Sequence, residues 1–269
     1  MDFRDDELKN FEANGALPLP DVTDEGFVEN DGASIHYSAY GAGAPVILIH
    51  GGLGHGGNWG YQVPALVDAG YCALLIDSRG HGRSTRDSKS YSYELMASDV
   101  LAVMDRLSIA KAALIGWSDG ACTSMVLGIK ASHRVTGVFF FGCNMDPSGT
   151  KEVQPSLALD RCFSRHVKDY AELSATPDQF EDFLAAVGKM MKTEPNYGAA
   201  ELAKITVPVT VVQSEHDEFI KQEHAEYLAR TIPGAEFLLL RGVSHFAPLQ
   251  RPDQFNQAVQ QFLDRLSAQ

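Results

Sequence analysis

The amino-acid sequence predicts an α/β fold, in which a mostly parallel sheet is covered by helices on both faces. Short apolar runs of strand length alternate with amphipathic stretches of helical length along most of the chain. This alternation is typical of parallel sheets, whose strands are joined by crossover helices. Polar and glycine-rich sequences follow several of the apolar runs. Ligands bind at the carboxyl ends of parallel strands, so we expect the functional site there.

The pattern divides the chain into an arm, a core and an insertion. Residues 1–25 are rich in acidic side chains and form the arm, and the core comprises 26–144 and 205–269. Between the two parts of the core, residues 145–204 contain no strong strand pattern, and we expect a helical lid insertion there.

Apolar runs within the core predict strands, and stretches of 3.6-residue periodicity predict helices. A hairpin is expected where Asn30, Asp31 and Gly32 separate two short apolar runs. The predicted strands are 27–28, 34–37, 44–49, 71–76, 112–115, 135–141, 207–212 and 236–240, and the predicted helices are 61–68, 93–107, 119–131, 157–173, 177–192, 223–231 and 252–266.

The N-terminal arm carries few aliphatic side chains. Leu8 and Phe11 have the spacing of one amphipathic helical turn. We expect the arm to pack on the surface of the chain or on a partner subunit, with disorder as the alternative. This arm is the reason to consider a homodimer.

Composition excludes several classes of protein. The 269 residues carry a net charge of −13. This charge argues against nucleic acid as a partner, because the chain offers no stripe of basic side chains that could bind phosphates. No apolar run has membrane-spanning length, and the start of the chain is acidic without an apolar leader. We therefore expect a cytoplasmic protein that binds a small-molecule substrate and neither membrane nor nucleic acid.

The four cysteines are interpreted as reduced core residues. They are Cys72, Cys122, Cys143 and Cys162, and none belongs to a C-x-x-C pair. This pattern favours neither a disulfide framework nor a zinc site, and we expect no metal.

The most informative stretch is a glycine-flanked serine between a predicted strand and a predicted helix. Residues 116–120 read Gly-Trp-Ser-Asp-Gly and fit G-x-S-x-G, the nucleophile elbow. Small residues two positions on either side of Ser118 permit a turn so tight that the serine side chain stands above the sheet. The alternative is an ordinary turn between a strand and a helix.

A serine nucleophile needs a base and a group that orients the base. His245 follows the last predicted strand and is the expected base. Asp217 follows the preceding strand, and its carboxylate would hold the imidazole in the correct tautomer. The chain order Ser118, Asp217, His245 is the order expected for an elbow serine.

Other acidic residues compete with Asp217 for the orienting role. Asp146 follows a neighbouring strand, and an orienting acid can occupy different strand ends with the same geometry. Glu215 and Glu218 flank Asp217, and we interpret both as solvated loop charges.

The tetrahedral intermediate of acyl transfer needs an oxyanion hole. The backbone N–H of Asp119, directly after the nucleophile, is one expected donor. The second donor is expected from the loop after strand 44–49, from Gly52 or alternatively Leu53. His50 in the same loop is expected to have a structural role.

These motifs together resemble the α/β-hydrolase fold superfamily over nearly the whole chain after about residue 25. The matching segments are 50–54, 77–84, 116–120 and the segments around Asp217 and His245. The resemblance implies a serine hydrolase that needs no cofactor. It does not specify the substrate, because one fold supports many reactions.

Residues 116–120, followed by Phe-Gly-Cys-Asn at 141–144, resemble valacyclovir hydrolase-like enzymes more narrowly. In that family an acid beside the nucleophile helps to hold the ammonium group of an α-amino-acid ester. The resemblance therefore implies substrate binding by Asp119, with Leu53 also expected at the substrate. The alternative is that Asp119 complements the positive end of the following helix.

We expect a serine hydrolase that cleaves a carboxylic ester or lactone of a small molecule through an acyl-enzyme. The alternatives are a carbon–carbon bond hydrolase, a cofactor-free perhydrolase, and a non-catalytic ligand receptor on the same fold. Apolar positions of the insertion line the acyl pocket or belong to the core: Phe163, His166, Phe180, Phe183, Met190 and Met191.

Overall fold

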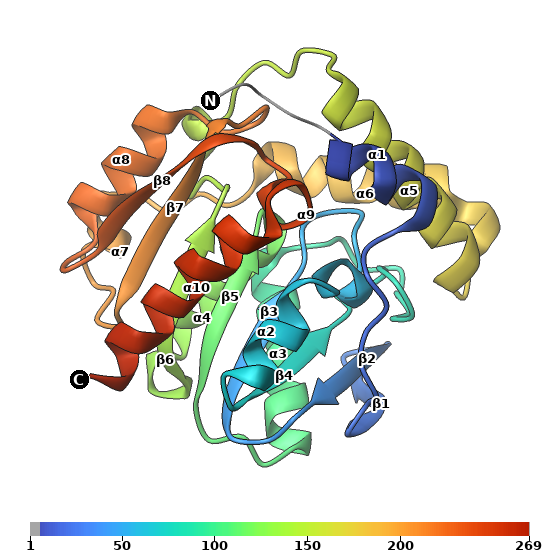
Figure 1. Ribbon diagram of the computed structural model, residues 1–269, viewed down its shortest axis with the longest axis horizontal. Coiled ribbons are helices and arrows are strands. Elements are labelled where there is room, and N and C mark those ends of the chain that lie inside the picture. The colour runs from blue at the N-terminus through green and yellow to red at the C-terminus, as the bar shows by residue number, and fades with distance from the viewer. Residues whose placement is uncertain (1–5, 269) are drawn as a thin grey trace.

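The computed structural model describes residues 6–268 (Figure 1). The start of the chain, residues 1–5, on which the expectation of an acidic start without an apolar leader partly rests, lies outside the described residues. The described chain forms an eight-stranded sheet in the order β1-β2-β4-β3-β5-β6-β7-β8. The strands are β1 Asp24–Asn30, β2 Ala33–Tyr40, β3 Ala44–Ile49, β4 Tyr71–Ile76, β5 Ala112–Trp117, β6 Val135–Phe141, β7 Val209–His216 and β8 Glu236–Ser244.

The sheet is mostly parallel, as the sequence predicts. Strands β1 and β2 form the expected hairpin, and β2 also runs antiparallel to β4. Every other neighbouring pair, from β4 across to β8, is parallel. The carboxyl ends of β3, β5, β6, β7 and β8 therefore lie at one edge of the sheet.

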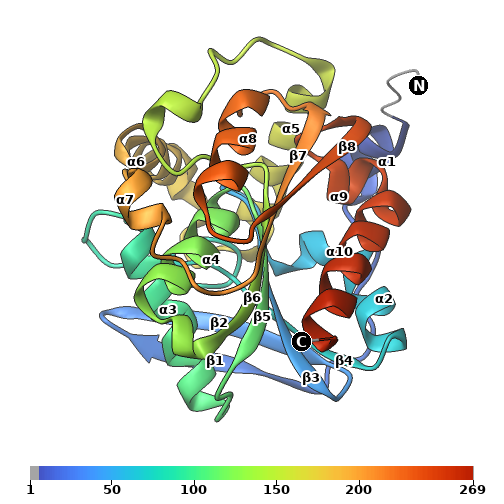
Figure 2. The ribbon, with the colours of Figure 1, turned by 90° about the vertical axis from the view of Figure 1, so that its left-hand side faces the viewer.

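Helices cover both faces of the sheet, and Figure 2 shows α3 and α4 on one side and α2 and α10 on the other. The α-helices are α1 Asp6–Asn14, α2 Gln62–Asp68, α3 Tyr93–Arg106, α4 Asp119–Lys130, α5 Leu157–Leu173, α6 Phe180–Thr193, α7 Ala199–Leu202, α8 Gln222–Thr231, α9 Ala247–Gln250 and α10 Pro252–Ser267. The short 3-10 helices are η1 Gly56–Trp59, η2 Ser132–Arg134, η3 Pro147–Gly149 and η4 Pro177–Gln179.

Two hydrophobic cores lie on the two faces because side chains alternate along each strand. In β3, Ile47 and Ile49 belong to the core beneath α3 and α4, whereas Val46 and Leu48 belong to the core beneath α2 and α10. All four side chains are buried. Burial on both faces explains why the central strands are continuous apolar runs in the sequence.

Segment 145–204 is helical, as the sequence predicts, and contains α5, α6 and α7. Helix α1 packs against α5 and α9, and its Leu8 and Phe11 are fully buried (Figure 1). The described part of the arm therefore begins with a helix of nine residues that packs on its own chain and is longer than the single turn that we expected. The homodimer stays a prediction.

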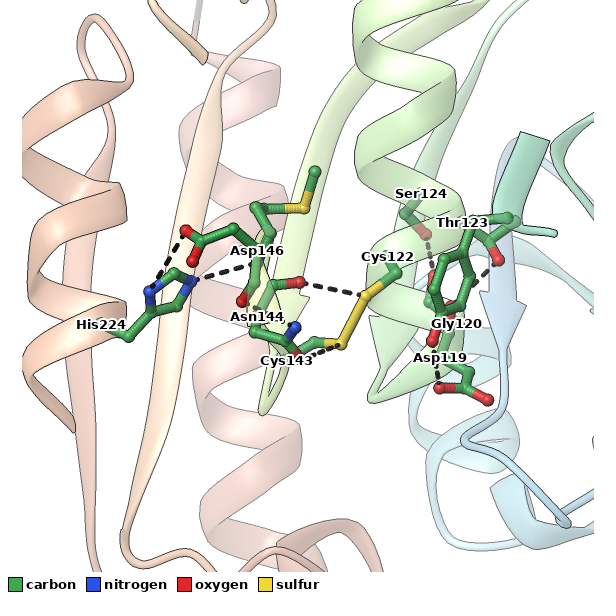
Figure 3. The surroundings of a disulfide bond; sticks show 11 residues. Asp119, Gly120, Cys122, Thr123, Ser124, Cys143, Asn144, Asp146 and His224 are labelled. Atoms are coloured by element: carbon green, nitrogen blue, oxygen red, sulfur yellow. Dashed lines mark hydrogen bonds and ion pairs between the residues drawn. A yellow bond between two sulfur atoms is a disulfide. The ribbon is translucent and has the colours of Figure 1, made fainter. Parts of the chain in front are cut away.

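Two of the cysteines correct the expectation of reduced thiols. Cys122 in α4 and Cys143 after β6 form a disulfide, shown in Figure 3, whereas Cys72 and Cys162 are free. The pairing of β5 with β6 brings the start of α4 beside the loop after β6, so the two Cα atoms lie 6.4 Å apart. This separation is within the range of disulfides. The sequence pattern alone could not show it, because the cysteines are 21 residues apart.

Within residues 6–268, no helix combines the length and the apolar character that crossing a lipid bilayer requires. The expected cytoplasmic location rested partly on reduced cysteines, and the disulfide removes that support. The location stays a prediction.

The disulfide predicts the number of accessible thiols in unfolded protein. Protein that is unfolded in denaturant without a reductant should react with a thiol reagent at Cys72 and Cys162 only. The same protein should react at all four cysteines after reduction. The closed loop of 21 residues should stabilise the fold by about 3 kcal/mol. Reaction at all four cysteines before reduction would contradict the pairing.

Candidate active site

Ser118 lies on a strained turn between β5 and α4, as the elbow motif predicts. Its φ is 53° and its ψ is −121°, a backbone conformation that costs energy for any residue with a Cβ. The turn is tight because a Cβ at Gly116 would overlap Ala121, and one at Gly120 would overlap the carbonyl of Ile49. The two glycines are therefore required by space.

His245 and Asp217 meet at the carboxyl edge of the sheet, next to the elbow. His245 Nδ1 lies 2.9 Å from Asp217 Oδ2, and both side chains are buried. The other carboxylate oxygen of Asp217 accepts hydrogen bonds from the N–H groups of Phe219 and Ile220 at 2.9 and 2.8 Å. Burial lowers the pKa of His245, but the carboxylates of Asp217, Glu218 and Asp119 together outweigh it and leave this pKa raised.

The alternative orienting residue lies elsewhere. Asp146 accepts a hydrogen bond from the N–H of Ser148 at 2.9 Å and lies 3.8 Å from the imidazole of His224. Figure 3 shows Asp146 turned toward His224. Of the two carboxylates, Asp217 is therefore the one that contacts His245.

The main chain of His245 is held on both sides by hydrogen bonds. The partners are Trp117, which precedes Ser118, and Glu218, which follows Asp217. Its carbonyl accepts a hydrogen bond from Trp117 Nε1 at 2.9 Å, and its N–H donates to Glu218 Oε2 at 2.9 Å. Glu218 is partly buried, and this corrects our interpretation of it as a solvated loop charge. The sequence contained no signal for these two contacts.

The loop after β3 is held in place by His50. Its Nδ1 lies 2.7 Å from the carbonyl oxygen of Gly51, and its Nε2 lies 3.0 Å from the N–H of Ser78. Complete burial lowers the pKa of His50 to about 4, so the imidazole is neutral near pH 7 and can donate at one nitrogen and accept at the other. These contacts agree with a structural role.

Two backbone segments border the space above Ser118. The N–H of Asp119 is the first of helix α4, and no helical carbonyl can accept it. Across from it, Gly52 is so close that a Cβ would lie 2.7 Å from Asp119 Oδ2. Leu53 follows with φ 65°, a second strained residue beside the site. The predicted oxyanion donors and Leu53 therefore lie at one location.

Ser118, His245 and the two backbone segments above the serine border one pocket of about 430 Å³. Its lining from the core includes Ser118, Asp119, His245, Gly52 and Leu53, and its lining from the inserted segment is Thr150, Leu159, Asp160, Cys162, Phe163, His166, Leu184 and Met191. Phe163, His166 and Met191 were predicted at this position. Phe183 and Met190 instead belong to the hydrophobic core, and Phe180 packs against that core.

Asp119 places a carboxylate in this mostly apolar pocket. Its Oδ1 accepts a hydrogen bond from Tyr93 Oη at 2.7 Å, whereas its Oδ2 is buried without a partner in the described part of the chain. Burial raises the pKa of Asp119 to about 6 despite the hydrogen bond from Tyr93. A buried, half-satisfied carboxylate is costly, which indicates a function at this position.

Across residues 6–268, no group of three or more His, Cys, Asp or Glu side chains could hold a metal ion.

Asp119 should reduce stability at neutral pH. Its pKa is about 6 in the fold and 3.8 in the unfolded reference, so the folded state binds more protons between these values and stability falls as the pH rises through them. Asp119→Asn should therefore increase the free energy of unfolding by about 3 kcal/mol above pH 6, and most of this gain should be lost at about pH 4. Urea unfolding at both pH values measures it, and an equal effect at both would contradict the expected ionisation.

Comparisons with known proteins agree with this geometry. The family model described as the alpha/beta hydrolase fold matches residues 44–170. A 2-hydroxy-6-oxononadienedioate/2-hydroxy-6-oxononatrienedioate hydrolase of Escherichia coli (strain K12) is 30% identical over 263 residues, which cover 86% of this chain and 91% of that protein. A putative non-heme chloroperoxidase of Synechocystis sp. is 26% identical, with 85% of this chain and 94% of that protein covered.

Among solved structures, Est816, an N-acyl homoserine lactone degrading enzyme, superimposes with a TM-score of 0.69 and 28% identity. The match covers 88% of this chain and 100% of Est816. The sheet order, the family model and the Escherichia coli relative all indicate the same family. The chain belongs to the α/β hydrolase fold family.

Proposed function

We propose that this protein is a serine hydrolase that cleaves an ester or lactone bond of a small molecule. The observation that carries the proposal is the 2.9 Å contact of His245 with Asp217 in the pocket that Ser118 also lines. Ser118 attacks the substrate carbonyl while His245 takes the hydroxyl proton, and Asp217 stabilises the resulting imidazolium. The N–H groups of Asp119 and Gly52 bind the oxyanion.

The same groups release the leaving alcohol and then hydrolyse the acyl-enzyme. His245 gives its proton to the leaving alcohol, and an acyl group remains on Ser118. The histidine then removes a proton from a water molecule that attacks the acyl group, and it returns this proton to Ser118 Oγ as the bond to the acyl group breaks and the acid leaves. In this scheme segment 145–204 acts as the lid over the acyl pocket.

The lining of the pocket favours a neutral or cationic acyl group. Apart from the acidic residues Asp119 and Asp160 and a few other polar groups it is apolar, and no lining residue in the described chain is a lysine or arginine. We propose that the free Oδ2 of Asp119 accepts a substrate ammonium or hydroxyl group, and that Leu53 contacts the substrate beside it. Location in the cytoplasm and a homodimer remain part of the proposal.

A carbon–carbon bond hydrolase is the second candidate. The Escherichia coli relative favours it, because its named substrates are dioates without an ester bond. A dioate carries two carboxylates, which would meet Asp119 and Asp160 but no lysine or arginine among the described lining residues. We therefore rank the ester or lactone reaction first. The chloroperoxidase relative makes a perhydrolase activity a third reaction to assay.

Ser118→Ala should abolish turnover and leave the fold intact. Loss of the nucleophile should lower kcat by at least about 10³-fold because the oxyanion hole alone retains little catalysis. The assay should include p-nitrophenyl esters, lactones and a hydroxy-oxo-dienedioate, with a fluorophosphonate probe to label Ser118. Thermal unfolding controls for misfolding. An unlabelled Ser118 together with tight ligand binding would instead support a receptor.

Asp119→Asn should change substrate preference. We expect wild-type protein to prefer an α-amino-acyl p-nitrophenyl ester over its desamino analogue, because the ammonium group pairs with the buried carboxylate. The neutral variant should reduce this ratio of kcat/KM by about 10-fold or more. Equal ratios for the two proteins would reject substrate binding by Asp119.

A further inference from the structure

We propose that Glu218 is a positioning residue that holds His245 in its catalytic orientation and stabilises the protonated imidazole. This inference rests on the proposed function, in which His245 is the general base. It assigns a role to a side chain that is adjacent in sequence to the orienting acid and that does not touch the substrate carbonyl.

The geometry gives His245 two carboxylate partners from a single turn. Asp217 Oδ2 contacts the imidazole at 2.9 Å, and Glu218 Oε2 accepts the backbone N–H of the same residue at 2.9 Å. The turn is rigid because Asp217 Oδ1 accepts the N–H groups of Phe219 and Ile220. One carboxylate therefore orients the ring, and the other fixes the main chain from which the ring projects.

The charges around His245 are predominantly negative. Asp217, Glu218 and Asp119 all favour its protonated form, and burial opposes it. Lys151, the cation bound to this turn, donates to the backbone carbonyl of Asp217 at 2.7 Å. Since His245 becomes positively charged when it takes the serine proton, the Glu218 carboxylate lowers the energy of that state.

The end of β7, just before this turn, provides a matched control. Glu215 lies three residues before Glu218 and accepts the N–H of Gly242, three residues before His245, at 2.8 Å. It also pairs with Arg241 at the surface, and it is not among the groups with the largest effects on the pKa of His245. Glu215 thus makes the same kind of backbone contact to the same segment without the electrostatic effect.

The test is an NMR titration of histidine-labelled protein, comparing wild type with Glu218→Gln and Glu215→Gln. His245→Gln identifies the resonance. Glutamine keeps an acceptor for the backbone N–H but removes the charge, so Glu218→Gln should lower the pKa of His245 by about 0.5 to 1 unit. The acid limb of kcat/KM should move by the same amount, and Glu215→Gln should change neither.

Glu218→Ala, which also loses the acceptor, should lower kcat by a further factor of about 10 with little change in KM. An unchanged His245 titration in Glu218→Gln, or equal shifts in both glutamine variants, would overturn the inference. The titration does not depend on turnover. Failure of the fluorophosphonate probe to label wild-type Ser118 would reject the proposed function separately.

Discussion

The site depends on the strained backbone of Ser118. A residue with φ 53° and ψ −121° is costly, by about 1 to 3 kcal/mol, and it persists only where surrounding contacts determine it. Here β5 ends between two parallel neighbours, and the N–H of Ser118 donates to the carbonyl of Phe141 in β6 at 2.9 Å. Helix α4 must then start at once, which leaves the N–H of Asp119 facing the pocket edge. The strain therefore positions the serine and an expected oxyanion donor together.

The other half of the site comes from chain segments that are far apart. Asp217 follows β7 and His245 follows β8, and β6 separates both from the elbow strand. A hydrogen bond from a side chain to the backbone bridges this distance, because the indole Nε1 of Trp117, beside the serine, donates to the carbonyl of His245. The packing of Phe219 edge-to-face on the imidazole, with centroids 4.7 Å apart, restricts the ring further. Such support is what a preorganised site needs.

The pocket combines apolar lining with a few buried polar groups that are poorly satisfied. Asp119 Oδ2 and His166 Nδ1 are both buried without a partner among the described residues. Burial lowers the pKa of His166 to about 4, so that its imidazole is neutral near pH 7. Groups that lower stability in this way are typical of sites whose polar partners arrive with a ligand.

Sequence alone determined the fold class, nearly all the core strands and the three residues of the expected triad. These follow from local rules: strands such as β3 and β6 are buried on both faces, and the elbow needs small residues at fixed offsets from the serine. Each motif also stands directly after a strand, so that parallel topology brings the motifs to one edge.

Only the tertiary structure decided which distant groups meet. The register of β5 with β6 brings Cys122 to Cys143, and the packing of α5 and α6 decides that Phe163 faces the pocket while Phe183 belongs to the core. Glu215 and Glu218 both lie within two residues of Asp217. Glu218 nevertheless accepts the backbone N–H of His245, whereas Glu215 accepts that of Gly242. The physical reason is that hydrophobic periodicity specifies which side of an element is buried but not which partner covers it.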